Sequence, residues 1–326
     1  MAVLSIRDLT VSFATEGGTL TALDKVSFDI PEKCIVGVVG ESGCGKSTLI
    51  NAILGLLAQN GRIEQGEILF EGEDIVGLGE ERLRALRGQK IATVFQDPMG
   101  ALNPVLSIGR QMVNIQYRSK ISRADKIARA LDMLKTVRIP DPEARLRQYP
   151  HEFSGGMKQR IAIAMALMME PALLIADEPT TALDATLEVA TIELLKELQR
   201  DIGCSVLFIS HHLGVVAELC DRVVVMYAGD VVERADVGRI FNQASHPYTE
   251  KLFECDPARL HQRARKLPTI PGEIPDLKQR PTGCIFAPRC QLVEARCSQP
   301  PPTVALAPDH HAACWLAGPL AAGGPT

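Results

Sequence analysis

The sequence is poor in aromatic residues and has no long apolar run. Phe, Trp and Tyr make up 4% of the 326 residues, whereas 46% are hydrophobic, a balance that suits an α/β protein with an aliphatic core. The longest apolar stretch, residues 161–176, is interrupted by Glu170 and Pro171, so no segment is expected to span a bilayer. Arg7 and Asp8 interrupt the apolar N-terminal stretch, which argues against a signal peptide.

Neither positive nor negative charge is in large excess. The formal net charge is −4, which offers no general attraction to nucleic acid, and we expect no nucleic-acid partner. A chain of this length can bury a large core, and it predicts one large domain with an appendage.

Residues 40–48, GESGCGKST, carry the strongest motif. They match the phosphate-loop pattern of a glycine, four arbitrary residues and Gly-Lys-Ser. The apolar residues 35–39 before them predict a buried strand, and the residues after them predict a helix. Backbone N–H groups at the start of that helix would bind phosphate, Lys46 would contact the β- and γ-phosphates, and Ser47 would bind Mg²⁺. The predicted nucleotide-binding residues here are Gly40, Glu41, Ser42, Gly43, Cys44, Gly45, Lys46, Ser47 and Thr48.

A second motif, residues 173–178, consists of four apolar residues followed by two carboxylates. This pattern predicts a buried strand that delivers Asp177 and Glu178 to a site at its carboxyl end. Asp177 would help to hold Mg²⁺, and Glu178 would act as the general base for the attacking water.

Between these motifs, Ser154, Gly155 and Gly156 stand at the predicted start of a helix, where a hydroxyl and backbone N–H groups form an anion cradle. With the phosphate loop and the two carboxylates, this sequence resembles the ATP-binding-cassette (ABC) superfamily, whose signature reads close to LSGGQ; here it is FSGGM. The resemblance covers residues 1 to about 250. It implies ATP, rather than GTP, with Mg²⁺ held by Ser47, Gln96 and Asp177.

The same resemblance assigns four further residues. Gln96 matches the Q-loop, which senses the γ-phosphate and leads to the contact with the membrane subunit. Asp184 matches the D-loop, and His211 matches the switch histidine that contacts the γ-phosphate, although His212 follows it where the family more often has an acid. Phe13 stands where the family places an aromatic to stack on adenine; a core or edge position is the alternative.

The resemblance also implies the fold and the mechanism. The fold is a mainly parallel twisted sheet with an antiparallel β-layer and a helical subdomain at about residues 97–160. Two cassettes would pair head to tail, so that Ser154, Gly155 and Gly156 of one close over the phosphate loop of the other. Glu178, His211 and Gln96 would then catalyse hydrolysis.

The C-terminal quarter contains two proline-rich segments, residues 246–257 and 267–290, that are expected to form neither a conventional helix nor a strand. It resembles the tail of ATPases that serve oligopeptide, dipeptide and nickel importers, through residues 246–249 (HPYT) and the segment that contains Gly283, Cys284 and Cys290. We therefore expect an ATPase domain at residues 1–250 and a tail at 251–326. The implied partners are a second ABC ATPase, most simply in a heterodimer, two membrane permeases and, indirectly, an external substrate-binding protein.

Four of the nine cysteines fall in this tail: Cys284, Cys290, Cys297 and Cys314. A short proline-rich segment with a small hydrophobic core needs a cross-link, such as a disulfide or a bound metal, to be stable. Disulfides are disfavoured in a reducing cytoplasm. Four thiolates satisfy a [4Fe–4S] cluster, which the resemblance favours; zinc and no metal remain alternatives. His310 and His311 are possible alternate ligands, although a solvated loop is the simpler interpretation of them.

The resulting prediction is the ATP-hydrolysing subunit of a di- or oligopeptide importer, bound peripherally at the cytoplasmic face of the membrane. Nickel or haem importers of the same family are alternatives, because the binding protein and the permeases select the substrate. A non-transport ABC ATPase is disfavoured by the absence of heptads and basic tracts. A metal-sensing regulator is disfavoured by the intact Glu178 and His211.

Overall fold

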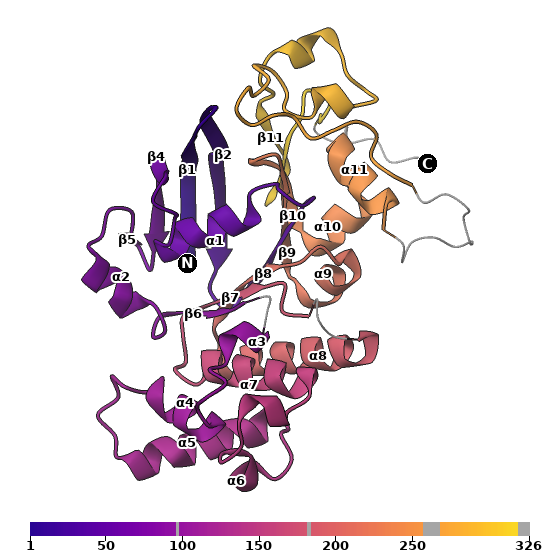
Figure 1. The fold of residues 1–326 in the computed structure, drawn as a ribbon. Coiled ribbons are helices and arrows are strands. Elements are labelled where there is room, and N and C mark those ends of the chain that lie inside the picture. Colours follow the sequence, from indigo (N-terminus) through magenta and orange to yellow (C-terminus); the bar gives the residue numbers. More distant parts are fainter. Residues whose placement is uncertain (96–97, 181–183, 257–267, 319–326) are drawn as a thin grey trace. The chain divides into compact units, whose positions relative to one another are not determined.

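The computed structural model describes residues 1–95, 98–180, 184–256 and 268–318. The chain divides into two compact units. Unit 1 comprises Met1, Pro31–Lys33 and Leu78–Phe208; unit 2 comprises Ala2–Ile30, Cys34–Gly77 and Ile209–Thr326. Figure 1 labels their elements.

Unit 2 contains an antiparallel β-layer. Its strands are β1 (Ala2–Thr15), β2 (Gly18–Pro31), β4 (Gly61–Phe70) and β5 (Glu73–Asp74), in the order β2-β1-β4-β5. β1 and β4 run antiparallel and lie side by side in Figure 1. Apolar side chains of β1 such as Leu4, Ile6 and Leu9 are completely buried, as expected for strands with one face on the core.

A second set of strands in unit 2 follows the order β11-β12-β10-β9-β3. These are β3 (Ile35–Val39), β9 (Arg222–Tyr227), β10 (Asp230–Asp236), β11 (Thr303–Ala307) and β12 (His310–Ala313). β3 is parallel to β9, and the other neighbours are antiparallel. All five residues of β3 are buried, so the strand predicted before the phosphate loop is confirmed.

The helices of unit 2 are α1 (Lys46–Leu54), α9 (Leu213–Leu219), α10 (Val237–Asn242) and α11 (Pro247–Glu254). Single 3₁₀ turns occur at Ala287–Arg289 and Ala295–Ser298. The expectation that residues 246–257 form neither helix nor strand is wrong for α11. α11 starts with proline at its first position, where no N–H is needed, and His246 caps it by accepting a hydrogen bond from the N–H of Tyr248 at 3.0 Å.

Unit 1 is built on β6 (Ile91–Val94), β7 (Leu173–Asp177) and β8 (Ser205–Ile209), in the order β8-β7-β6, with β8 in the unit as far as Phe208. β6 and β7 are parallel. Its helices are α2 (Glu80–Leu86), α3 (Pro98–Ala101), α4 (Ile108–Asn114), α5 (Arg123–Thr136), α6 (Pro142–Arg145), α7 (Gly155–Leu167) and α8 (Ala185–Ile202), with a 3₁₀ turn at Pro150–Glu152. α7 packs against α3, α5, α8 and β6.

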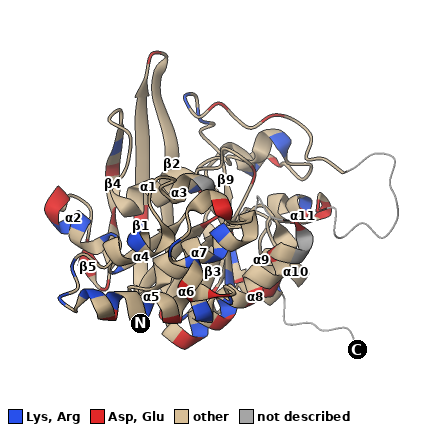
Figure 2. Cartoon of the chain, turned by 60° about the horizontal axis from the view of Figure 1, so that its bottom comes forward, with Lys and Arg blue, Asp and Glu red and all other residues tan. Residues whose placement is uncertain are grey.

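The helix α5 is amphipathic, with Ala130 and Leu134 buried. It begins after Ser122, whose side chain accepts a hydrogen bond from the N–H of Asp125 at 3.1 Å, and ends at Thr136. Acidic and basic residues adjoin on helices such as α2, as Figure 2 shows. In the part of the chain that the structure describes, no helix is both long and apolar enough to cross a membrane.

Candidate nucleotide site

The phosphate loop joins β3 to α1 and is pressed against β9. Gly40 has a φ of +153°, and a Cβ atom there would lie 2.1 Å from the carbonyl oxygen of Met226. Gly45 has a φ of +107°, and its Cβ would lie 2.7 Å from a methyl carbon of Leu23. Only glycine fits at both positions, so the glycines of the motif set the path of this loop.

The loop has the electrostatic character of an anion site. Gly45 caps α1 without any side-chain hydrogen bond, and the first turn of α1 contains no acidic residue, so the positive end of the helix dipole is not compensated there. The ammonium of Lys46 folds back and donates to the carbonyl oxygens of Gly40 at 2.7 Å and Glu41 at 3.2 Å. Burial raises the pKa of the Cys44 thiol, which therefore adds no negative charge at neutral pH.

The remaining predicted residues of unit 2 differ in their exposure to solvent. Ser42, Gly43 and Ser47 are exposed, whereas Thr48 is half-buried. Phe13 is half-buried at the end of β1, and its ring lies over Gly61, its partner in β4. His211 is exposed, and its ring meets that of His212 edge to face at 4.4 Å.

In unit 1 the two predicted carboxylates lie at the carboxyl end of β7. Asp177 is the last residue of the strand and Glu178 follows it; both are half-buried. Glu178 has a φ of +46°, the left-handed region that non-glycine residues rarely adopt and that is frequent at functional sites. The predicted strand with two acids at its end is confirmed.

Ser154, Gly155 and Gly156 form the start of α7. Ser154 is the N-cap, and its hydroxyl accepts a hydrogen bond from the N–H of Met157 at 3.4 Å. Ser154 and Gly155 are exposed, and Gly156 is buried against Leu187. The cradle predicted from the sequence is therefore open to solvent on the surface of unit 1.

Of the two remaining predicted residues, the structure describes Asp184 but not Gln96. Asp184 precedes α8, and its carboxylate accepts a hydrogen bond from the N–H of Leu187 at 3.0 Å. Gln96 lies outside the described residues, so its assignment stays a prediction.

The four tail cysteines lie near one another but do not form a recognisable metal site. Cys284, Cys297 and Cys314 are buried and Cys290 is half-buried. Burial raises the pKa of Cys284, and the nearby Cys297 and Cys314 raise it further. Among the residues that the structure describes, no three His, Cys, Asp or Glu side chains are placed to hold a metal ion together. The predicted [4Fe–4S] cluster and its zinc alternative are therefore not supported by this arrangement.

Sequence reasoning missed two features of the tail. His310 is 2% exposed, within β12, and its Nε2 atom lies 2.8 Å from the carboxylate of Glu233, so the solvated loop expected for it is wrong. Arg289 points its guanidinium at the carboxylate of Glu41, in the phosphate loop. No motif marks either pair, because their members are 77 and 248 residues apart in the chain.

Comparison with known proteins identifies the family to which this chain is similar. Residues 23–181 match the family "ABC transporter", and residues 232–297 match "Oligopeptide/dipeptide transporter, C-terminal region". The chain is 47% identical over 317 residues to the dipeptide transport ATP-binding protein DppD of Bacillus subtilis, covering 96% of this chain and 94% of that protein. It is 44% identical to the oligopeptide transport ATP-binding protein OppD of Salmonella typhimurium over 314 residues, with 96% and 93% coverage.

A solved structure with the same fold is the dimeric, post-hydrolysis state of the ATP-binding cassette MJ0796, bound to ADP and Pi. It aligns with a TM-score of 0.63 at 29% identity, over 72% of this chain and 98% of that one. The likeness confirms the predicted fold of a phosphate-loop ABC cassette. From its sequence and its structure, this chain belongs to the family of ABC transporter ATP-binding proteins of the oligopeptide/dipeptide type, and it is an ATPase.

Proposed function

We propose that this chain is the ATP-hydrolysing subunit of an importer of dipeptides or short oligopeptides. The observation that carries the proposal is a phosphate loop in a chain whose C-terminal region matches that of oligopeptide and dipeptide transporters. Relatives named as dipeptide and oligopeptide transport ATP-binding proteins support the substrate class. Nickel or haem import is the alternative, since this subunit does not hold the selective pocket.

The site residues divide the chemistry of hydrolysis among them. Lys46 exchanges its contacts with the loop carbonyls for the β- and γ-phosphates of ATP, and the uncapped start of α1 binds phosphate oxygens. Ser47, Asp177 and Gln96 hold Mg²⁺, Glu178 is the general base, and His211 contacts the γ-phosphate. Phe13 stacks on adenine. Ser42, Gly43, Cys44 and Thr48 contribute backbone N–H groups to the loop.

A single chain does not make a complete site under this proposal. The exposed Ser154 and Gly155 at the start of α7 are available to the nucleotide on a second cassette, with Asp184 at the crossing between the two. The dimeric state of the related cassette MJ0796 supports this pairing. We infer that the second cassette is a related ATPase rather than a copy.

A groove in unit 1 is suited to a membrane permease. Its volume is about 710 Å³, and its lining is mainly apolar, with Phe95, Leu102, Tyr117, Met165 and Met169 among its residues. The side chains of Phe95 and Tyr117 are 48% and 67% exposed, so the groove presents contiguous apolar surface of the kind that marks interaction sites. A short helix of a permease would bury them and hold the chain peripherally at the cytoplasmic face of the membrane.

The test is uptake of a labelled dipeptide into vesicles that hold this chain with its partner ATPase, two permeases and the external binding protein. We expect uptake that requires ATP and falls at least tenfold for Tyr117→Asp, with ATP binding unchanged. Labelled nickel or haem accumulated in place of the peptide would overturn the substrate class. The matched control is Tyr149→Asp, which alters a tyrosine of unit 1 that is 42% exposed and lies outside the groove.

The tail cysteines have a second proposed role as ligands of a [4Fe–4S] cluster, with zinc as the alternative. Backbone N–H groups donate to the sulfur atoms of Cys284, Cys290 and Cys314, contacts that stabilise a thiolate or a metal-bound sulfur. The test is to measure the content of iron, acid-labile sulfide and zinc in the anaerobically purified protein and in the Cys290→Ser variant. About four irons and four sulfides, lost in the variant, support the cluster; absence of both metals removes it.

A further inference from the structure

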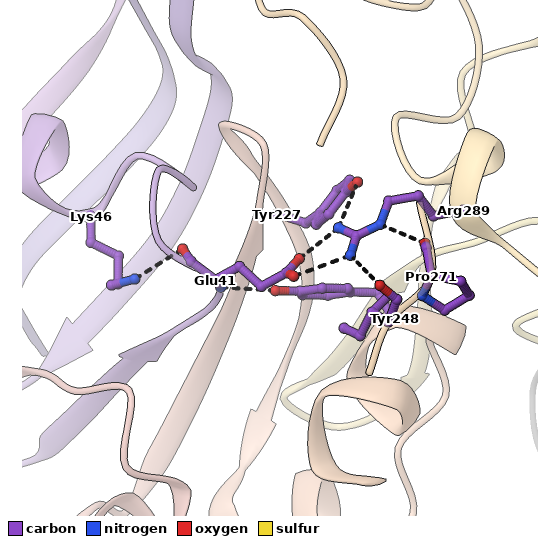
Figure 3. Close-up of polar contacts among 7 residues, drawn as sticks. Glu41, Lys46, Tyr227, Tyr248, Pro271 and Arg289 are labelled. Atoms are coloured by element: carbon purple, nitrogen blue, oxygen red, sulfur yellow. Dashed lines mark hydrogen bonds and ion pairs between the residues drawn. The ribbon is translucent and has the colours of Figure 1, made fainter. Parts of the chain in front are cut away.

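The tail contacts the phosphate loop through a partly buried ion pair. Arg289 donates to both carboxylate oxygens of Glu41, with Nη1–Oε2 at 2.7 Å and Nη2–Oε1 at 3.1 Å (Figure 3). The Arg289 side chain is 4% exposed and that of Glu41 is 27% exposed. A two-pronged contact of this kind fixes both the position and the orientation of the carboxylate.

Arg289 is fully satisfied by its surroundings. Besides the two bonds to Glu41, it donates to the hydroxyl of Tyr227 at 3.3 Å and to the carbonyl oxygens of Pro271 at 3.0 Å and Ile270 at 3.0 Å. These contacts use all five N–H groups of a guanidinium. The arginine is therefore held in place by the tail and by β9, and it offers a fixed positive charge to the loop.

The main chain of Glu41 is held by a second residue. Its N–H donates to the hydroxyl of Tyr248, in α11, at 2.9 Å. Tyr248 is completely buried, and its ring packs against those of Tyr227 and Phe286, with centroids 4.6 and 5.4 Å apart. Both the backbone and the side chain of Glu41 are thus positioned by residues beyond position 245.

This arrangement matters because Glu41 is an acid inside an anion-binding loop. An unpaired carboxylate at this position would repel a triphosphate and would compete with it for the ammonium of Lys46, which already contacts the Glu41 carbonyl. Pairing with Arg289 cancels the charge and, as Figure 3 shows, directs the carboxylate away from Lys46. The phosphates then meet only the positive groups of the loop.

We propose that Arg289, assisted by Tyr248, is a positioning residue for ATP: it neutralises Glu41 and orients it, so that the tail sets the nucleotide affinity of the phosphate loop. The proposal rests on the proposed ATP site. It predicts an effect on binding, with little effect on the chemical step, because Arg289 touches the loop through Glu41 and not the reacting atoms.

The test is a double-mutant cycle on the whole chain, read out as the Kd of a fluorescent ATP analogue with Mg²⁺. Arg289→Met should raise the Kd about tenfold, because it leaves the Glu41 carboxylate unpaired. In the Glu41→Gln background, the same change should raise the Kd less than about twofold, since no charge remains to be neutralised. The kcat of Arg289→Met, measured at saturating ATP, should stay within about twofold of the natural value.

Two further variants separate positioning from folding. Tyr248→Phe removes only the hydroxyl that accepts the Glu41 N–H, and it should raise the Kd about threefold, in line with one lost hydrogen bond. Arg296→Ala is the matched control, because Arg296 is an exposed tail arginine paired with Glu294, and it should leave the Kd unchanged.

An equal rise in Kd for Arg289→Met in both backgrounds would overturn the proposal, as would a rise that appears only where the melting temperature has fallen below that of the assay. Failure of the unaltered chain to bind the ATP analogue would instead refute the proposed ATP site. The two failures are therefore distinguishable in one set of measurements.

Discussion

The carboxylate of Glu233, in β10, lies 2.8 Å from Nε2 of His310, in β12, with both side chains almost completely buried. The same carboxylate accepts hydrogen bonds from the N–H groups of Ser245 at 2.8 Å and His246 at 3.0 Å. One buried acid thus connects three segments of unit 2, namely β10, the start of α11 and the last strand of the tail.

Replacement of Glu233 should strongly destabilise unit 2. Glu233→Ala leaves His310 and the backbone N–H groups of Ser245 and His246 without their acceptor, and we expect the free energy of unfolding to fall by about 3–5 kcal/mol. Urea unfolding measures this change in the free energy of unfolding. Glu254→Ala is the control, because Glu254 is exposed and paired with Lys251; its cost should stay below about 1 kcal/mol. Equal midpoints for both variants would contradict the assigned role.

Stability should fall in acid through His246. Burial lowers the pKa of His246 to about 3, against about 6.5 in an unfolded chain. Between these values the unfolded state binds the additional proton, so the free energy of unfolding falls as the pH falls from about 6.5 towards 3, by up to about 1.4 kcal/mol per pH unit. Above pH 6.5 this residue contributes no pH dependence.

The measurement is urea unfolding of the natural chain and of His246→Asn between pH 4 and 7. Asparagine retains an oxygen to cap α11 but does not titrate in this range, so the variant should show a shallower dependence on pH. His151→Asn, which alters an exposed histidine of unit 1, should reproduce the natural slope. Parallel curves for all three proteins would refute the assignment to His246.

Glu178→Gln should separate ATP binding from ATP hydrolysis. Removal of a general base costs about 10²–10⁴-fold in rate, whereas the amide keeps the shape of the side chain. We expect ATP affinity within about threefold of the natural value and turnover reduced at least a hundredfold, measured as phosphate release with the partner ATPase present. Glu170→Gln, which also alters a unit 1 glutamate with positive φ, should retain full turnover. Near-normal turnover by Glu178→Gln would remove Glu178 from the role of base.

Gly283→Ala should loosen the tail. A Cβ atom at this position would lie 2.3 Å from the carbonyl oxygen of Cys297, which accepts the N–H of Cys284 at 2.9 Å. The backbone has to shift, at a cost of about 1–3 kcal/mol, and amide hydrogen exchange in residues 284–300 should accelerate. Gly318→Ala, where the added Cβ meets nothing within 4 Å, is the control. Unchanged exchange in Gly283→Ala would show that the tail absorbs the methyl group.

Features built from neighbouring residues were predictable. β3, the phosphate loop and α1 follow one another in the chain, and their apolar periodicity and glycines encode them locally. The strand that ends in Asp177 is encoded in the same way. α11 could also have been found, because Pro247 suits the first position of a helix and the residues that follow are compatible with one.

Features that join distant parts of the chain could not be predicted. The contact between Glu41 and Arg289 depends on how the tail packs against β9. The sequence around a single arginine does not indicate which acid it will pair with. The burial of His310 has the same origin, since it follows from the pairing of β12 with β10. The geometry of the cysteines is likewise a tertiary property that their irregular spacing does not specify.

The pairing of β12 with β10 also covers an edge of β10. β10 pairs with β9 along one side, and the tail hairpin β11-β12 occupies the other. A strand with one open side offers a ladder of unused N–H and C=O groups to other chains, and natural proteins cover such edges. A chain cut after α11 would expose β10 in this way, so the tail doubles as a cover against aggregation.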